Sequence, residues 1–439
     1  MTDSYEYFRW LSHPAAERPP EPWKPLSDAN YRERPARRPD HIRTLALAPA
    51  WAEDLQRVAR AVFAADRCAP RTERFDRWTR HLRLDVPVTA PDRWTQALPH
   101  LLSLLSTVTG DVWDVSFRTH EKKRHHADPL GTESRYIASE YTADEVALFS
   151  GGLDSLGWAA RRTSNTTSRL LLVSFEEANF ETEQRRLFGF VSGLRKPLPR
   201  LLSENQAVIG PGGRRHAERS TRSRGLLYAA GAVKAAAAER VPLVHVPENG
   251  QLAVNFPLSA ARSAACSTRS VHPWTLHHLN RVIAEIAAPG AEVRVTNPFA
   301  DRTKGEVCVA ARDAGLPREV LEATISCGQP PRRQPGRSDL AHCGVCFPCL
   351  IRRSGLLYAF GEDNTPYAAD PWDAGLPTEK QRLWSALRRW LARDYSVLDL
   401  IADHPLPAQA EPGELLKVIE RGRDELRGWV AWSVDSRRR

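Results

Sequence analysis

The sequence predicts an α/β protein built on a doubly wound parallel sheet, with an N-terminal α+β domain and C-terminal helices. Strand and helix patterns alternate from residue 141 onward, as a parallel sheet with helices on both faces requires. The apolar run at residues 146–149 fits a strand buried on both faces, and the two glycines just after it allow a tight turn into a helix. Helical patterns rich in Trp and Leu fill much of residues 366–439.

Length and composition divide the chain into four parts. At 439 residues, 42% of them hydrophobic, the chain is long enough for two or three domains with substantial cores. Residues 1–42 are rich in Pro and Arg and lack periodicity, so we expect an extended arm. We then expect an α+β accessory domain at 43–140, the α/β domain at 141–365 and a helical extension at 366–439.

The net charge and the lengths of the apolar segments indicate whether the protein binds nucleic acid or a membrane. The net charge of +9 comes from 62 basic and 53 acidic residues that are scattered along the chain. Polynucleotide binding remains open but is not favoured, because binding of nucleotides or acidic partners explains the same charge. No apolar run is long enough to cross a bilayer, and the first residues lack the apolar segment of a secretory signal. We therefore expect a cytoplasmic protein with no membrane partner.

The accessory domain is expected to alternate between helix and strand. Residues 52–68 carry apolar side chains at helical spacing, and residues 92–110 repeat that pattern with Gly110 as a stop signal. Two segments of alternating apolar and polar residues, 80–88 and 111–119, are typical of half-buried strands. This domain contains no recognisable catalytic group of residues.

The turn at the start of the α/β domain has the sequence SGGLDS, residues 150–155. Asp154 and Ser155 stand where the next helix should begin, so backbone N–H groups, the helix dipole and serine hydroxyls converge there. Such a point binds anions, and phosphate above all. The loop lacks the Lys-Ser/Thr pair of a Walker loop, and the alternative is a glycine turn in an ordinary α/β protein.

Polar residues follow several of the predicted strands. In doubly wound sheets, ligands bind beyond the carboxyl ends of the strands, where Glu248 and Asn249 follow one apolar segment. From an earlier strand, the same edge is expected to carry Glu176, Glu177 and Asn179. Asp301 or Thr303 is placed to cap a later helix with Lys304 in its first turn. Lys304 is either an ordinary surface charge or a balance for polyphosphate charge.

Four of the seven cysteines form the second strong signal. Cys343, Cys346 and Cys349 have CxxCxxC spacing, and Cys327 precedes them across a Pro-rich loop. Four thiolates suit a closed tetrahedral zinc site, whose role is structural because no coordination position stays open. An iron–sulfur cluster and unligated thiols are the alternatives.

These motifs, taken together, resemble a known family. SGGLDS resembles the loop of the PP-loop ATP pyrophosphatases, which have the adenine nucleotide alpha hydrolase-like fold, bind ATP and release pyrophosphate. The order of SGGLDS, TNPFADRTKGEV, TISC and CGVCFPCLIR is similar to that in the 7-cyano-7-deazaguanine synthases, known as QueC. SRGLLYAAGA is also similar to a segment of that family in which Arg224 matches an Arg. The resemblance covers residues 144–360.

The resemblance implies an ATP-dependent ligase or synthase that adenylates the carboxylate of 7-carboxy-7-deazaguanine beside a structural Zn²⁺. The residues expected to bind ATP are Ser150, Gly151, Gly152, Leu153, Asp154 and Ser155. Asp154 would also orient the loop or help to hold Mg²⁺, and Lys304 and Arg224 would offset charge on the leaving pyrophosphate. The expected catalytic residues are thus Asp154, Ser155, Lys304 and Arg224.

The chain departs from that family at both ends, because a typical synthase begins almost at its SGGxDS loop. The additional segments resemble those of the long QueC-like proteins of bacterial anti-phage defence cassettes, with QatC of the Qat system closest in architecture. The synthases use ammonia as the amine that attacks the acyl-adenylate. In a defence relative, we expect an amine of a partner protein instead.

Other hypotheses stay open at this point. An ordinary synthase would use ammonia, and a non-catalytic nucleotide-sensing module would keep the fold for assembly alone. A tRNA-modifying PP-loop enzyme with thiolation chemistry would need a reactive cysteine near the loop, whereas the clustered cysteines are explained by zinc. The C-terminal helices are either a bundle packed on the α/β domain, which is the favoured hypothesis, or a surface for a partner.

Overall fold

The computed structural model describes the chain between residues 5 and 438 apart from several segments. The residues outside the description are 1–4, 13, 15–16, 32–46, 72–77, 121–141, 177–180, 198, 206–217, 219, 259–268, 329–331, 334–339 and 439. Among the described helices, none combines the length and the apolar character that crossing a membrane requires.

The N-terminal part contains a four-stranded, all-parallel sheet in the order β2-β1-β3-β4. Its elements are β1 (Glu6–Trp10), β2 (Lys24–Leu26), the short 3₁₀ helix η1 (Asp28–Asn30), β3 (His81–Val88) and β4 (Val112–Thr119). The first two strands correct the expectation of an extended arm at residues 1–42. Phe8 and Trp10 pair in register within the sheet and are fully buried, so this segment belongs to the core. Both strands are short and lie among prolines, so the sequence shows no alternating pattern that would predict them.

Two helices, α1 (Ala50–Cys68) and α2 (Pro91–Thr109), cover one face of this sheet. Both lie where the apolar spacing predicts them. Pro91 suits the first position of α2 because its missing N–H has no partner there in any helix. Gly110 ends α2 with a φ of 72°, the left-handed conformation that favours glycine.

The second sheet is also all-parallel, in the order β7-β6-β5-β8-β9, which confirms the predicted doubly wound fold. Its strands are β5 (Glu145–Leu148), β6 (Leu170–Glu176), β7 (Arg200–Asn205), β8 (Leu243–His245) and β9 (Arg294–Thr296). The strand order reverses beside β5, which pairs with both β6 and β8. Ligands of open α/β sheets bind at this switch point, beyond the carboxyl ends of the strands.

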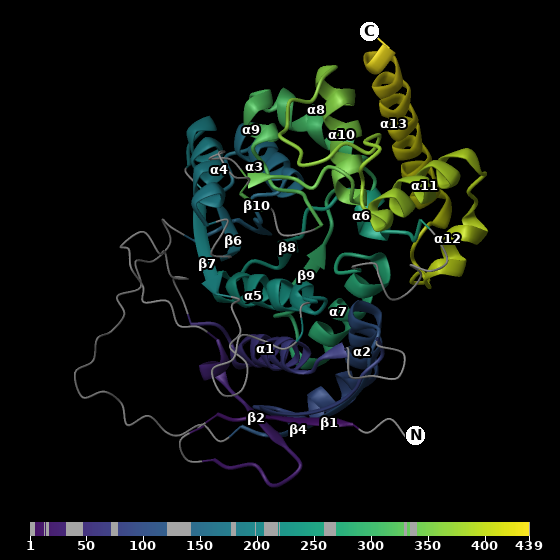
Figure 1. Cartoon of the computed structure of the whole chain (residues 1–439). Coiled ribbons are helices and arrows are strands. Elements are labelled where there is room, and N and C mark those ends of the chain that lie inside the picture. Colours follow the sequence, from purple (N-terminus) through teal and green to yellow (C-terminus); the bar gives the residue numbers. More distant parts are fainter. Residues whose placement is uncertain are drawn as a thin grey trace.

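Helices cover both faces of the second sheet. They are α3 (Leu153–Asn165), α4 (Glu181–Leu194), α5 (Arg224–Glu239), α6 (Gly250–Val254), α7 (Pro273–Ile286), α8 (Lys304–Asp313), α9 (Arg318–Glu322) and α10 (Phe347–Phe360). Figure 1 shows α3, α4, α8 and α10 above the sheet and α5 and α7 below it. The strands β10 (Arg332–Arg333) and β11 (Leu340–Ala341) form a small antiparallel pair.

The two sheets are joined through their helices. Helix α1 packs on α5 and α2 packs on α7, so the N-terminal sheet lies below these four helices in Figure 1. One continuous hydrophobic core contains Leu55 and Val62 of α1, Leu105 of α2 and Leu227 and Val233 of α5. The N-terminal part therefore covers apolar faces of α5 and α7 that would otherwise be exposed.

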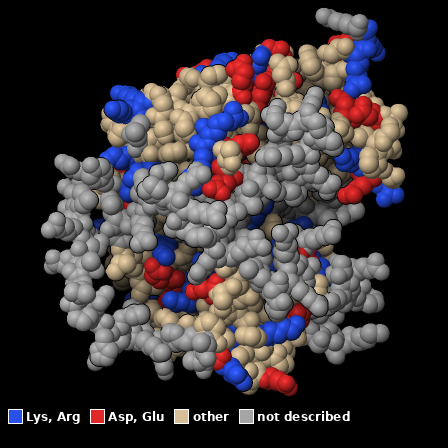
Figure 2. Space-filling model, turned by 60° about the vertical axis from the view of Figure 1, so that its left-hand side comes forward, with Lys and Arg blue, Asp and Glu red and all other residues tan. Residues whose placement is uncertain are grey.

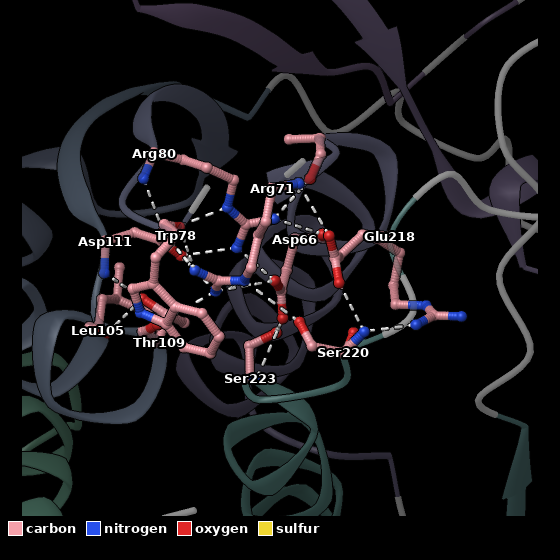
Figure 3. Close-up of polar contacts among 12 residues, drawn as sticks. Asp66, Arg71, Trp78, Arg80, Leu105, Thr109, Asp111, Glu218, Ser220 and Ser223 are labelled. Carbon is pink, nitrogen blue, oxygen red and sulfur yellow. Dashed lines mark hydrogen bonds and ion pairs between the residues drawn. The ribbon is translucent and has the colours of Figure 1, made fainter. Parts of the chain in front are cut away.

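A buried network of ion pairs reinforces this contact (Figure 3). The guanidinium of Arg80 is fully buried and donates to Asp66 Oδ1 and Asp111 Oδ2, both at 2.6 Å. Arg71 donates two further hydrogen bonds to Asp111, each 2.9 Å long. The second oxygen of Asp66 accepts from the N–H and the hydroxyl of Ser223, at 3.1 and 2.5 Å. Ser223 directly precedes α5, so the start of that helix is tied to the N-terminal part.

The C-terminal helices are α11 (Thr378–Ala392), α12 (Val397–Asp403) and α13 (Pro412–Arg438). They form a separate hydrophobic core with α6 and α10, in which Trp384, Trp390 and Trp429 are buried. Phe256, which follows α6, stacks on Trp390 with ring centres 4.3 Å apart. The structure therefore agrees with the favoured hypothesis of a bundle packed on the α/β domain.

Candidate functional site

The SGGLDS loop connects β5 to α3 at the switch point of the sheet. Gly151 has a φ of 73°, and a Cβ added there would lie 3.0 Å from Cγ of Gln184 in α4, so the turn requires glycine. Gly152 is the N-cap of α3, and no side chain caps this helix. The first turn of α3 thus keeps the open N–H groups and the dipole that attract anions.

The two serines hold the loop in a preformed shape. The N–H of Ser150 donates to Ser155 Oγ at 3.2 Å, and the Ser155 hydroxyl donates to the carbonyl of Gly152 at 3.1 Å. Gln184 donates to the carbonyl of Ser150 at 2.9 Å. The side chain of Leu153 is buried in the core below α3, so this residue can offer a ligand only its backbone.

Asp154 and Lys304 meet in a buried ion pair behind the loop. Lys304 Nζ lies 2.5 Å from Asp154 Oδ2, and the two side chains are 2% and 8% exposed. The amide of Asn249 also donates to Asp154 Oδ2, at 3.2 Å. Lys304 follows β9, Asp154 follows β5 and Asn249 follows β8. The structure thus brings together polar groups from the ends of three strands, as expected at the carboxyl edge of a parallel sheet.

Glu248 completes this cluster with a second carboxyl group. The Asn249 amide bridges to Glu248 Oε1 at 3.0 Å, and Asn297 binds both the N–H and the carbonyl of Glu248. Burial and the neighbouring Asp154 charge raise the pKa of Glu248 well above its usual value. Burial acts in the same direction on Asp154, yet the Lys304 ammonium overrides it and lowers the pKa of Asp154. The pair with Lys304 therefore favours the ionised form of Asp154, whereas the surroundings of Glu248 favour its protonated form.

One oxygen of this cluster has no partner among the described residues. Asp154 Oδ1 is buried and accepts no hydrogen bond from any described group, while Oδ2 accepts two. A buried carboxylate oxygen without a partner is costly unless a ligand or cation completes it. Asp154 lies in the first turn of α3, so this oxygen is suited to a cation that accompanies a nucleotide.

The four cysteines come together as the sequence predicts. Their Sγ atoms all lie within 4.8 Å of one another. The Cys327–Cys346 and Cys343–Cys349 separations are 3.9 and 3.8 Å. A tetrahedron of thiolates with zinc–sulfur bonds of about 2.3 Å has edges of about 3.8 Å, so the donor set fits zinc. The N–H groups of Gly328, Cys343 and Cys346 donate to these sulfur atoms, which further suits thiolates.

The cysteine cluster lies beside the loop. Residues just before Cys327 reach the turn, since a Cβ added to Gly152 would lie 3.2 Å from the carbonyl oxygen of Ile325. This segment is fixed by Arg352, which is fully buried and donates to the carbonyl of Leu321 and the hydroxyl of Thr324. A metal held by the cysteines would thus fix one wall of the site without taking part in chemistry.

Replacing Cys346 by Ser is expected to remove bound zinc and to lower Tm and soluble yield, because metal binding contributes to the folding free energy. Elemental analysis of the purified wild-type protein should give one zinc per chain. Cys68→Ala, at a buried thiol of α1, is the matched control and should keep the metal. Iron or no metal in the wild-type protein would remove the assignment.

The remaining sequence candidates divide into two groups. Arg224 is an exposed residue at the start of α5, directly after Ser223, and its part in catalysis stays a prediction. The side chain of Glu176, and all of Glu177 and Asn179, lie outside the described residues. Three residues that contact the site or its supports came with no sequence signal: Gln184, Gln251 and Glu425.

The fold and this site define a doubly wound, parallel-sheet α/β protein with four clustered cysteines beside its strand-to-helix turn. A profile of the family described as "Queuosine biosynthesis protein QueC" matches residues 272–359, which include Lys304 and all four cysteines but not the SGGLDS loop. The 7-cyano-7-deazaguanine synthase of Methanothermobacter thermautotrophicus is 37% identical over 75 residues. That segment is 17% of this chain and 29% of the synthase, so the chain matches less than a third of its relative. No solved structure matches the chain.

Proposed function

We propose that this protein is an ATP-dependent, QueC-like enzyme that adenylates the carboxylate of 7-carboxy-7-deazaguanine or a close analogue. The observation that carries the proposal is the buried Asp154–Lys304 pair behind an uncapped helix end, next to four clustered cysteines. The similarity of residues 272–359 to QueC supports the same substrate class.

The chemistry begins with ATP on the loop. Ser150, Gly151, Gly152 and Ser155 bind its phosphates, and Asp154 orients the loop and offers Oδ1 to Mg²⁺. The substrate carboxylate attacks the α-phosphorus and pyrophosphate leaves, with Lys304 and Arg224 offsetting its charge. The acyl-adenylate has a good leaving group, so an amine can attack its carbonyl carbon and release AMP.

The amine in this proposal belongs to a partner protein of an anti-phage defence cassette. The support is architectural: the described residues place a sheet with α1 and α2 before the α/β domain and α11, α12 and α13 after it, and these add surface that an enzyme using ammonia does not need. A docked protein presents its amine at a high effective concentration, which bulk ammonia matches only when abundant. Figure 2 shows basic and acidic side chains interspersed on the described part of one face, so a polynucleotide is the less favoured partner.

Incubation with ATP, 7-carboxy-7-deazaguanine and either ammonia or the proteins encoded beside this gene tests the proposal. We expect AMP and pyrophosphate, together with a partner protein that gains the mass of the deazaguanine acyl group by intact-mass analysis. Efficient nitrile formation from ammonia, with no labelled protein, would instead assign an ordinary 7-cyano-7-deazaguanine synthase. ADP and phosphate as products, or no ATP consumption at all, would contradict the adenylation itself.

A further inference from the structure

The C-terminal helix α13 reaches the first turn of α8, which carries Lys304. Glu425, on the inward face of α13, accepts hydrogen bonds from the hydroxyl of Thr303 and, at 3.1 Å, from the N–H of Gly305. Its side chain is buried. Lys304 lies between these two residues in the chain. The Glu425 carboxylate therefore contacts the residues on both sides of the lysine that pairs with Asp154.

All four N–H groups at this end of α8 are satisfied within the protein, although a helix end normally leaves them unpaired. The pairs are Thr303 to Glu306 at 3.0 Å, Lys304 to Gln251 at 3.0 Å, Gly305 to Glu425 at 3.1 Å and Glu306 to Thr303 at 3.1 Å. This end of α8 therefore has no N–H group left for a phosphate, unlike the uncapped start of α3. Its role is to hold Lys304 in place.

Two glycines allow the helices to approach this closely. A Cβ added to Gly305 would lie 2.5 Å from Glu425 Oε1, and one added to Gly422 of α13 would lie 2.1 Å from Gln251 Nε2. Gln251 is the residue that accepts from the N–H of Lys304. Helix α13 therefore supports the turn twice, directly through Glu425 and indirectly by packing on Gln251.

We propose that Glu425 is a positioning residue, which fixes the first turn of α8 so that Lys304 meets Asp154 at the phosphate-binding loop. The proposal rests on the function proposed above, in which Lys304 balances phosphate charge. It gives the C-terminal helix, which the similarity to QueC at residues 272–359 does not include, a part in nucleotide binding. Both carboxyl oxygens of Glu425 accept a hydrogen bond, one from Thr303 and one from Gly305, so the ionised carboxylate is the form that fits this position.

The ionisation of Glu425 supplies a test by pH. Burial raises its pKa to about 7, while the hydrogen bonds from Thr303 and Gly305 lower it. The titratable groups that face it are Glu306 and Cys308 of α8, Arg421 of α13 and Tyr358 of α10. Because the folded pKa is raised from 4.5, the stabilising contribution of Glu425 is fully present below pH 4.5 and is lost as pH rises through about 7. ATP affinity should change in the opposite direction, because positioning needs the charged form.

Calorimetric titration of the full-length protein with ATP between pH 5.5 and 8.5, alongside Tm without ATP, tests this role. We expect Glu425→Gln to bind ATP at least about tenfold more weakly at pH 8, since it loses a hydrogen bond to a charged group. We also expect ATP affinity to rise near pH 7 in the wild type and this rise to be absent in the variant. Asp424→Asn is the matched control, because this neighbouring carboxylate pairs with Arg427 on the exposed face. It should behave as wild type.

Two results separate the claims. Unchanged ATP affinity and an unchanged pH profile in Glu425→Gln would overturn the positioning role, as would an affinity loss that only follows a loss of Tm. A wild-type protein that binds ATP without forming AMP would overturn the proposed function alone, because the titration measures binding and not turnover.

Discussion

Replacing Asp154 by Ala is expected to abolish the formation of AMP and pyrophosphate and, at the same time, to destabilise the fold. The variant leaves the Lys304 ammonium buried without its partner, which costs about 3–5 kcal/mol of the free energy of unfolding. It also removes the oxygen offered to the metal–nucleotide complex, which should lower turnover by at least about 10²–10³-fold. Product analysis by chromatography and thermal unfolding measure the two effects separately.

The double variant Asp154→Asn with Lys304→Met separates chemistry from stability. Both charges are removed from the buried site, so the free energy of unfolding should recover most of the loss while turnover stays abolished. Ser155→Ala is the second control, because it breaks contacts within the loop but leaves the buried pair intact. It should keep Tm near that of the wild type and lose activity. Full turnover in the double variant would remove Asp154 and Lys304 from the mechanism.

The parts of the site that could be predicted are those with a local signal. The loop at 150–155 and the cysteines at 343–349 are each contiguous motifs, so the chain alone defines their geometry. The pairing of Asp154 with Lys304 was not predicted, although the rule that the carboxyl ends of parallel strands meet at one edge of the sheet placed both residues near that edge. The structure agrees with that rule through a contact across 150 residues.

The supports of the site could not be predicted, because their partners are distant and their own sequence is ordinary. Gln251 and Glu425 contact the first turn of α8 from 53 and 120 residues away. A buried Gln and a Glu on an amphipathic helix look the same in sequence as surface residues. The strands β1 and β2 were missed for a related reason, since five and three residues are too few for a pattern to emerge.

Replacing Arg80 by Leu is expected to destabilise the whole protein, although Arg80 lies far in sequence from the loop. Its guanidinium is fully buried between Asp66 and Asp111, so the variant removes the cation that pairs with both carboxylates. Breaking a buried network of this kind costs about 3–5 kcal/mol. Arg83→Leu, at an exposed ion pair between β3 and Asp114 of β4, is the matched control and should change stability by less than about 1 kcal/mol.

The form of the unfolding curve decides whether the N-terminal part is a separate domain. Because α1 packs on α5, α2 packs on α7 and Asp66 holds Ser223, we expect Arg80→Leu to unfold in a single transition that is lowered as a whole. An independent accessory domain would instead give two transitions. One would be lowered by Arg80→Leu, and the other would keep the wild-type Tm and would alone rise when ATP is added.

For the same reason, deletion of residues 1–140 is a poor test of partner transfer, since it exposes the apolar faces of α5 and α7 and removes the acceptor for Ser223. Substitutions on the outer surface of the N-terminal sheet, which leave this joint intact, are the variants that can separate docking of a partner from adenylation.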